Sequence, residues 1–231
     1  MRPAEALEIS GYLSAYTVAQ LSPIVELGSS TAEFRQVVKP HIENDLHRPL
    51  RTRGVKIITT DIKAGDGIDI SGDIYDVEVR ETLKSLHPRA LLCCNIFEHL
   101  QDRQSFARLC ANLLEPEGVL VVSVPFDYPH HGDPIDTMYR PSPEEVAELF
   151  PEFVVRSATV VADGSYGQDL GEMSYGQIAA NMVGGALKLA KLIVKRRLDE
   201  FSSQRFFWLF KPYKVTIVVL QKQAAQQFFD I

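Results

Sequence analysis

Two short stretches contain four side chains suited to proton transfer near neutral pH. Three are histidines, and the fourth is an aspartate that could orient one of them. His99 follows an apolar run, whereas His130, His131 and Asp133 lie in the long polar loop 125–141. Imidazole titrates close to neutral pH, which suits removal of a proton from a hydroxyl group as it attacks. These four residues are candidates for the catalytic base, and bracing of the loop is the alternative role for the histidines. A metal site there lacks an evident fourth ligand, so we expect none.

A second stretch, Ile24 to Thr31, has the pattern of a strand, a tight turn and the start of a helix. Gly28 can adopt backbone angles that a side chain forbids, and the helix start offers free N–H groups to an anion. Glu26 is unusual at the end of a buried strand, because a buried carboxylate needs a partner. The dinucleotide-binding fingerprint has three glycines where this stretch has one, so an ordinary strand-to-helix turn stays open as the alternative.

Carboxylates also follow the next predicted strands. Asp61 ends the apolar run 55–61, and in folds of this kind a carboxylate at that point holds ribose hydroxyls. Its two oxygens can accept hydrogen bonds from a vicinal diol. The aspartates between 65 and 76 are spaced somewhat like a calcium loop, but the required glycine and terminal glutamate do not fit, so we reject calcium.

These residues need a scaffold, and alternating apolar runs and helical patterns predict one of the α/β class. We expect strands beginning at residue 24 and over 55–61, 68–70, 89–95, 119–124, 153–161 and 215–220. We expect helices within 3–20 and over 32–38, 77–86, 104–114, 142–150 and 177–201. The polar stretch 39–54 contains Pro40, Pro49 and Gly54 and is expected to be an irregular connection, as is the glycine-rich start of the segment 163–214.

Composition narrows the setting of the protein. The 231 residues carry a net charge of −6, which gives no general case for nucleic-acid binding. We see no signal-peptide pattern and no run of about 18 apolar residues, and three cysteines without metal or disulfide spacing suit reduced thiols in the cytoplasm. The segment 188–214 has eight Lys/Arg and two Asp/Glu, a net +6, beside an aromatic cluster. Residues 177–214 are thus a candidate peripheral membrane or homodimer contact, or a helix packed on its own domain.

In order, these features resemble the class I S-adenosylmethionine-dependent methyltransferases, from about Ile24 to Leu220. The matching features are the stretch 26–29, Asp61, the turn 72–74, Asn95 with the pair 98–99, and the turn 116–118. The stretch 124–141 is similar to a subgroup often associated with bacterial surface-glycan synthesis. The resemblance implies one Rossmann-like, doubly wound domain, 1–231. Its seven-stranded, mostly parallel sheet would have an antiparallel last strand, a helical cap at 1–22 and a helical insertion at 163–214.

The resemblance also implies a cofactor site for S-adenosyl-L-methionine. Its residues by position are Glu26, Gly28, Ser29, Asp61, Ile62, Asp73, Ile74 and Asn95. Gly28 would face the methionine moiety, Asp61 the ribose and Asp73 the adenine amino group. The loops carrying His99 and His131 would then converge on the methyl group.

The expected function is methyl transfer to a small-molecule or sugar hydroxyl. A degenerate family member that serves as a cofactor-binding or scaffold subunit is the alternative, favoured by the missing glycines. A nicotinamide dehydrogenase is disfavoured because the three-glycine fingerprint is missing.

Overall fold

The structure is a computed structural model that describes residues 1–131, 135–172 and 208–224. The chain forms two compact units, one made of Met1–Val161 and Lys214–Ile231 and the other of Ala162–Tyr213. Asp133 and the helix predicted at 177–201 lie outside the described residues, as does most of the proposed contact segment 177–214. None of the described helices is long and apolar enough to cross a membrane.

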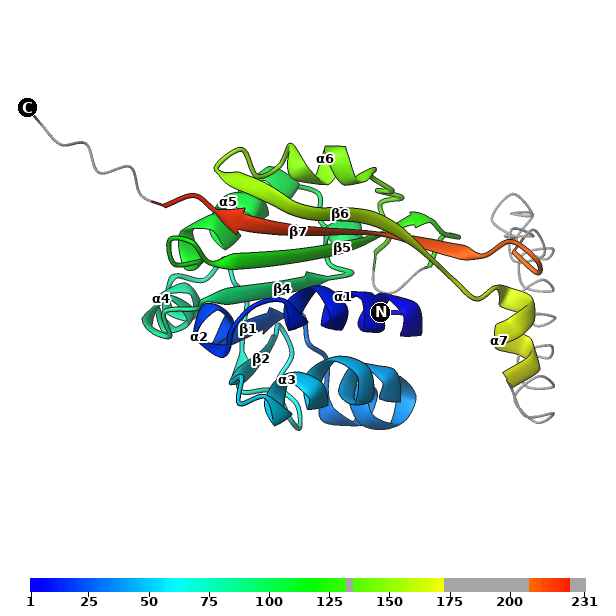
Figure 1. The fold of residues 1–231 in the computed structure, drawn as a ribbon, viewed down its shortest axis with the longest axis horizontal. Helices are drawn as coiled ribbons and strands as arrows, with labels where there is room; N and C mark the ends of the chain where they lie inside the picture. Colours follow the sequence, from blue (N-terminus) through cyan, green and yellow to red (C-terminus); the bar gives the residue numbers. More distant parts are fainter. Residues whose placement is uncertain (132–134, 173–207, 225–231) are drawn as a thin grey trace, which may run out of the picture. The chain divides into compact units, whose positions relative to one another are not determined.

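A seven-stranded sheet in the order β3-β2-β1-β4-β5-β7-β6 forms the centre of the first unit (Figure 1). Its strands are β1 (Ile24–Leu27), β2 (Ile57–Asp61), β3 (Ile70–Ser71), β4 (Ala90–Cys94), β5 (Val119–Asp127), β6 (Phe153–Asp163) and β7 (Tyr213–Lys222). The first five strands in chain order pair in parallel, with Glu26 opposite Thr59 on one side and Leu92 on the other. β1 and β4 are apolar or buried along almost their whole length, as expected for central parallel strands.

The last strand runs in the opposite direction to β5, with Val121 opposite Val219. The hydrogen bonds from Gln223 N–H to Glu152 O and from Tyr213 N–H to Gly164 O place β6 antiparallel to β7 as well. The predicted fold class, a doubly wound, mostly parallel sheet with an antiparallel last strand, is confirmed.

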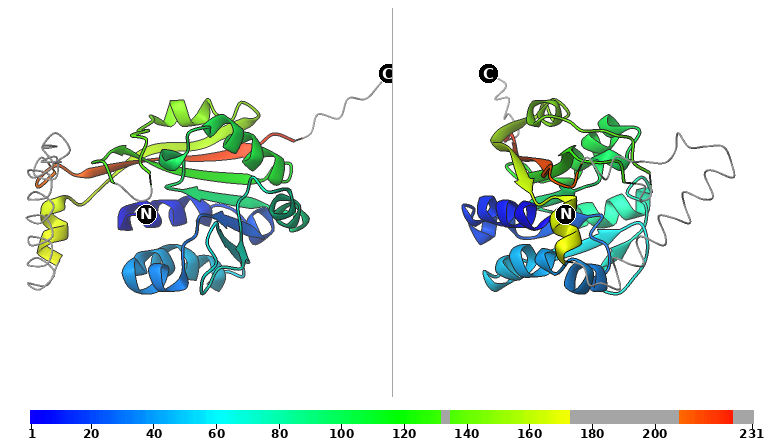
Figure 2. Two further views of the ribbon diagram at one scale, coloured as in Figure 1. Left: turned by 180° about the vertical axis from the view of Figure 1, so that it is seen from behind. Right: turned by 90° about the vertical axis from the view of Figure 1, so that its right-hand side faces the viewer.

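Helices cover both faces of the sheet, as the rotated views show (Figure 2). On one face α1 (Pro3–Ser14), α2 (Val18–Leu21) and α3 (Arg48–Thr52) bury an apolar cluster that includes Ile9, Leu13 and Leu50. On the other face α4 (Val77–Ser85), α5 (Arg103–Leu113) and α6 (Pro143–Ala147) pack over β4 and β5.

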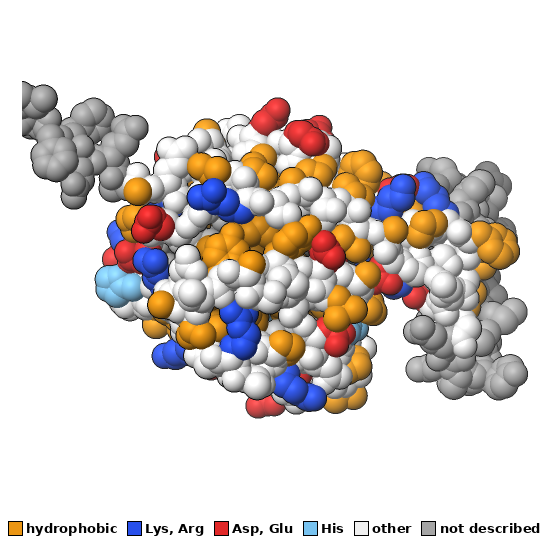
Figure 3. Space-filling model, viewed as in Figure 1, with side chains coloured by type: hydrophobic (Ala, Val, Ile, Leu, Met, Phe, Trp, Pro, Cys, Tyr) orange, Lys and Arg blue, Asp and Glu red, His pale blue; other side chains and the backbone are white. Residues whose placement is uncertain are grey.

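On the face of the molecule shown in Figure 3, positively and negatively charged side chains are interspersed with apolar ones. Each fully buried Leu or Ile contributes about 1.5–3 kcal/mol.

The stretch 39–54 differs from the prediction, because most of it is helical. After the π-helical turn η1 (Phe34–Val38), a second π-helical segment, η2 (Ile42–His47), leads directly into α3. Ile42, Leu46 and Leu50 recur every four residues and are buried, which is the reason the segment folds onto the sheet. Pro49 lies at the first or second position of α3, where proline is best tolerated.

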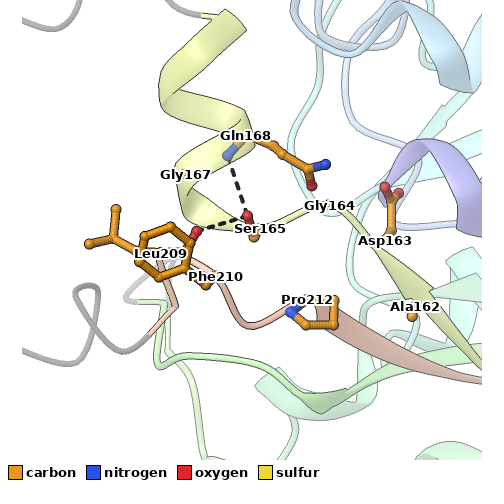
Figure 4. Close-up of a pocket in the computed structure, with 9 residues that line it drawn as sticks. All are labelled: Ala162, Asp163, Gly164, Ser165, Gly167, Gln168, Leu209, Phe210 and Pro212. Carbon is orange, nitrogen blue, oxygen red and sulfur yellow. Dashed lines mark hydrogen bonds between the residues drawn. The ribbon is translucent and has the colours of Figure 1, made fainter.

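The second unit also corrects an expectation. The glycine-rich start of the segment is not wholly a loop, since α7 (Tyr166–Glu172) is helical. Ser165 Oγ caps this helix by accepting from Gln168 N–H, and it donates to Leu209 O (Figure 4). A Cβ atom at Gly167 would lie 2.4 Å from Leu209 O, so glycine is required there by the close approach of the two segments.

Candidate active site

The carboxyl ends of β3, β2, β1 and β4 lie next to one another along one edge of the sheet. The turns that follow these strands carry Asp73, Asp61, Gly28 and Asn95, in that spatial order. Ligands of open parallel sheets bind at this edge, near the point where the strand order reverses between β1 and β4. The fold therefore brings the predicted cofactor residues onto one continuous rim.

The turn after β1 exposes backbone to this rim. Gly28 and Ser30 have φ angles of 67° and 59°, and Gly28 is exposed. A Cβ atom on Gly28 would meet the Ile96 side chain at 3.2 Å, so the turns after β1 and β4 are in contact. The buried Ser29 donates its N–H to Thr60 O at 2.8 Å, which fixes the turn against β2.

A buried arginine holds this turn from beneath. Arg35 is 3% exposed, and its guanidinium donates to Ser29 O at 3.2 Å, to Ser30 O and to Gly67 O at 2.7 Å. The guanidinium thus links the turn after β1 to the loop before β3. This turn lacks the second and third glycines of the dinucleotide-binding fingerprint. Sequence reasoning missed Arg35, because nothing in the pattern of a surface helix marks one arginine as buried.

Asp61 lies at the end of β2 beside the same turn. Its carboxylate accepts from Ser30 N–H at 2.9 Å and from Lys63 N–H at 3.1 Å. A carboxylate offers about four acceptor positions, so Asp61 retains capacity for a diol. Ile62, the next residue, is 65% exposed and presents an apolar side chain at the rim.

The turn after β3 has a structural role of its own. Asp73 Oδ1 accepts from Tyr75 N–H at 2.9 Å, so this aspartate does act as a turn residue. Gly72 has a φ of 144°, and a Cβ atom there would lie 2.7 Å from Val79 Cγ2. Ile74 is half-buried and packs against the core. The turn is therefore rigidly held while the carboxylate stays at the rim.

Asn95 is bonded to a residue from the N-terminal helix. Its Nδ2 donates to Glu5 Oε1 at 2.8 Å, and Ser123 Oγ donates to the same oxygen at 2.5 Å. Glu5 is fully buried, and Asn95 has a φ of 55°. Glu5 therefore fixes the helical cap 1–22 to the turn after β4, a contact that sequence reasoning missed.

The partner that Glu26 needs comes from the segment predicted to be irregular. His47 Nε2 lies 3.0 Å from Glu26 Oε2, and both side chains are buried. His47 Nδ1 also lies 3.7 Å from Glu43, whose carboxylate accepts two bonds of 2.9 Å from Arg51. The buried carboxylate at the end of β1 thus begins a chain of polar contacts that reaches the surface.

A second group of proton-exchanging side chains lies beyond Asn95. His99 Nε2 and His131 Nε2 lie 3.8 and 3.9 Å from Glu98 Oε1. We call Glu98, His99 and His131 the acceptor cluster. Glu98 is fully buried, and neither of its oxygens has a hydrogen-bond partner among the described residues. Glu98 and His99 are therefore not a surface pair, because the glutamate is buried.

Two loops distant in the chain are bonded together around this cluster. Thr137 donates both its N–H and its Oγ1–H to Glu98 O, at 2.9 and 2.8 Å. Arg103 donates to Phe97 O and to Thr137 Oγ1, and its guanidinium lies 4.0 Å from the centre of the Tyr139 ring. The loop after β5 is therefore fastened to the turn after β4, which holds His131 near His99.

Burial and pairing shift the pKa values here in different directions. Burial raises the pKa of Glu98 to about 8 and lowers that of His131. Burial alone would raise the pKa of Asp136, but hydrogen bonds from Arg140 and from the backbone of His131 and Met138 hold it well below its usual range. Asp136 is thus a paired anion that shapes the loop, whereas Glu98 lacks such pairing.

The predicted proton-exchanging residues are only partly brought together. His99 and His131 meet, with ring centres 5.4 Å apart, whereas His130 is exposed and does not belong to the cluster. Arg140, in the same loop, binds Asp136 at 2.6 Å and Tyr128 O at 3.3 Å. Glu98 and Asp136 were not among the predicted site residues. The sequence did contain one signal for Glu98, because it directly precedes the predicted His99.

Two open cavities stand out among the described residues, and neither contains a predicted site residue. One, of about 480 Å³, is lined by residues of the second unit alone, among them Ser165, Gln168 and Phe210 (Figure 4). The other, of about 260 Å³, lies between α5 and the segment 148–153. We place the candidate site at the rim, because the chemistry and strand ends converge there.

No protein-family model and no curated protein matches the chain. Solved structures do match. A Galdieria sulphuraria protein assigned as a sarcosine dimethylglycine methyltransferase is 14% identical, with 95% of this chain and 84% of that one covered and a TM-score of 0.52. Coclaurine N-methyltransferase, bound to N-methylheliamine and SAH, is 12% identical (95% and 70% covered, TM-score 0.51). The [4+2]-cyclase SpnF is 13% identical (94% and 81%, TM-score 0.52). At these identities the likeness establishes the fold, which is the Rossmann-like methyltransferase fold.

Proposed function

We propose that the chain is an S-adenosylmethionine-dependent methyltransferase whose acceptor is a hydroxyl group of a small molecule or sugar. The observation that carries the proposal is the order of the turns along the rim, with Asp73, Asp61, Gly28 and Asn95 side by side and the acceptor cluster beyond them. The methyltransferase fold of the solved structures supports this, although SpnF is described as a cyclase, so fold alone does not decide the reaction.

The cofactor would lie along this rim. Asp61 would accept from the ribose hydroxyls, with the exposed Ile62 against the adenine ring, and Asp73 would accept from the adenine amino group with the backbone of Ile74 at the ring edge. The exposed Gly28 would leave backbone open to the methionine end, beside the buried Ser29 and between Glu26 and Asn95. The residues at the rim fit this cofactor, because their donors and acceptors match its polar groups in order.

The reaction is an in-line displacement. The acceptor oxygen attacks the sulfonium methyl carbon, the new C–O bond forms as the C–S bond breaks, and the sulfur retains that electron pair in the thioether product. Alignment of the two reactants supplies much of the acceleration. The hydroxyl proton leaves at the acceptor cluster, where His99 is oriented for this task. Its Nδ1 donates to Ile135 O, so Nε2 carries the free lone pair.

We further propose that the acceptor belongs to surface-glycan synthesis and that the enzyme works in the cytoplasm. The first statement rests on the similarity of loop 124–141 to the glycan-associated subgroup. The second is supported by three free cysteines, Cys93, Cys94 and Cys110, which suit a reducing compartment.

Calorimetry with S-adenosylmethionine, S-adenosylhomocysteine and NAD tests the cofactor assignment directly. We expect binding of the first two and none of NAD. Transfer of a labelled methyl group is then measured over sugars, nucleotide sugars and amines, with hydroxyl acceptors expected to react. Absence of binding by the first two ligands would reject the enzyme and favour the scaffold role, while labelling of amines alone would reject the hydroxyl acceptor.

A further inference from the structure

We propose that Glu98, His99 and His131 bind a divalent first-row transition-metal ion such as Zn²⁺. One ligand atom from each of these residues lies within 4.8 Å of the other two. A tetrahedral ion with ligand bonds of about 2.1 Å holds its ligands roughly 3.4 Å apart, so a small inward rotation of the side chains completes the site. Two imidazole nitrogens with one carboxylate oxygen are a ligand set that suits Zn²⁺ and its neighbours and suits Mg²⁺ poorly.

The second observation is the state of the Glu98 side chain. It is fully buried, both oxygens lack a hydrogen-bond partner among the described residues, and Oε1 faces the two imidazoles. A buried polar group left in this way is costly, and a bound cation removes the cost. Among the described residues of the same loop, Asp136 needs no such ion, because it is already bonded to Arg140 at 2.6 and 3.0 Å.

The hydrogen bond of His99 prepares it as a ligand. Ile135 O can only accept, so Nδ1 of His99 carries the proton and Nε2 presents its lone pair to the cluster. Metal-binding histidines are commonly oriented in this way by a backbone carbonyl at the other ring nitrogen. Both imidazoles are partly exposed, 22% for His99 and 32% for His131, so an ion can enter and a fourth position stays open.

A role in the reaction follows if the proposed methyl transfer is correct. The open position would take the acceptor hydroxyl, whose pKa falls when its oxygen binds a cation. The O–H bond breaks with the proton passing to water, and the oxygen then attacks the methyl carbon as the C–S bond breaks. The charge of the ion does not change. In this state the two histidines act as ligands, and the ion replaces an imidazole base.

Metal binding is measured on the tag-free full chain, without S-adenosylmethionine, so that its outcome is independent of the proposed function. The protein is stripped with EDTA and titrated with Zn²⁺ in the calorimeter, then with Co²⁺ while its visible ligand-field bands are followed. We expect one ion per chain and a site that Mg²⁺ does not fill. Glu98→Gln and His131→Gln should each weaken Zn²⁺ binding by at least about 100-fold.

The matched control is His87→Gln. His87 forms a surface pair with Glu115 at 2.8 Å and thus has the same residue types in an exposed setting. It should leave Zn²⁺ affinity unchanged, and circular dichroism checks that every variant is folded. Three results would overturn the proposal: no Zn²⁺ binding by the wild type, unchanged binding by a folded Glu98→Gln variant, or an equal loss in His87→Gln. Methyl transfer that persists in EDTA-treated protein would reject the catalytic role and leave the site itself intact.

Discussion

Glu26 and Glu98 both lie buried near the carboxyl edge of one sheet, yet their surroundings differ. Glu26, on the cofactor side, has an imidazole nitrogen 3.0 Å from its carboxylate. Glu98, on the acceptor side, has two imidazoles at 3.8 and 3.9 Å and no hydrogen-bond partner among the described residues. In the part of the chain that the structure describes, buried polar atoms without a hydrogen-bond partner occur on both sides, since Glu26 Oε2 and both ring nitrogens of His47 share this state with the Glu98 oxygens. The two carboxylates differ instead in the distance to the nearest imidazole nitrogen, which is about 0.8 Å shorter at Glu26.

The largest effect is expected from breaking the Glu26 contact. His47→Ala leaves a buried carboxylate without its partner, and such a loss costs about 3–5 kcal/mol. Urea unfolding of the variant should show that decrease in the unfolding free energy. In the double variant Glu26→Leu/His47→Leu, where neither polar group remains, most of the loss should be recovered. Equal destabilisation by the single and double variants would show that packing of His47, and not its pairing, is what matters.

Removal of the charge at Glu98 should have the opposite effect on the unfolding free energy, and raise it, in protein stripped of divalent ions. Its pKa is about 8 in the folded chain against an ordinary 4.5, because burial disfavours the charged form. A raised pKa adds stability that is complete below the unfolded value and is lost as pH rises through the folded one. The unfolding free energy should therefore fall between pH 4.5 and 8, by on the order of a few kcal/mol.

The Glu98→Gln variant removes this pH dependence of the unfolding free energy, because a glutamine amide does not titrate between pH 4.5 and 8. Relative to the wild type, the variant should gain stability steadily from pH 5 to pH 8, as followed by urea unfolding at each pH. A difference that stays constant with pH would mean that Glu98 keeps its charge in the folded protein, paired by something that the described residues do not supply.

The two sides also differ in how far the sequence could predict them. The rim residues follow strand ends, and strands such as β4 are recognisable as short apolar runs, so Asp61 and Asn95 were placed correctly on the fold. Their partners were not. Glu5 meets Ser123 across 118 positions of sequence, and Arg35 is buried by tertiary contacts that local pattern does not contain.

Helical structure was missed where two signals conflicted. Pro40, Pro49 and Gly54 indicated a break, whereas Ile42, Leu46 and Leu50 had the spacing of a buried helix face, and burial of those side chains decided the outcome. At the acceptor cluster the obstacle was different. The burial of Glu98 depends on the loop after β5. Thr137 of that loop donates a hydrogen bond to Glu98 O, although the two residues are 39 positions apart in the sequence.

An intermediate effect should follow from Asp61→Ala, which tests the cofactor side in its proposed role. A hydrogen-bonded charged site is worth about 1.5–3 kcal/mol, which corresponds to roughly 10- to 150-fold weaker binding of S-adenosylhomocysteine by calorimetry. Asp66→Ala is the control, because Asp66 is an exposed aspartate in the following loop. Since Asp61 also accepts from Ser30 and Lys63, unfolding is measured in parallel. Unchanged affinity in a folded Asp61→Ala variant would move the ribose elsewhere.

The smallest effect is expected from Ile62→Ala, which separates binding from folding at the same rim. Ile62 is 65% exposed, so its truncation should change the unfolding free energy by less than about 0.5 kcal/mol. If the adenine ring covers this side chain, the lost apolar contact should weaken S-adenosylhomocysteine binding by about 1 kcal/mol, or roughly fivefold. Val155→Ala is the matched control, because Val155 is 44% exposed on β6, at the opposite end of the strand order from β2 and β3. Equal losses of affinity in the two variants would place the adenine away from Ile62, whereas a loss confined to Ile62→Ala would show that this exposed apolar side chain contacts the cofactor.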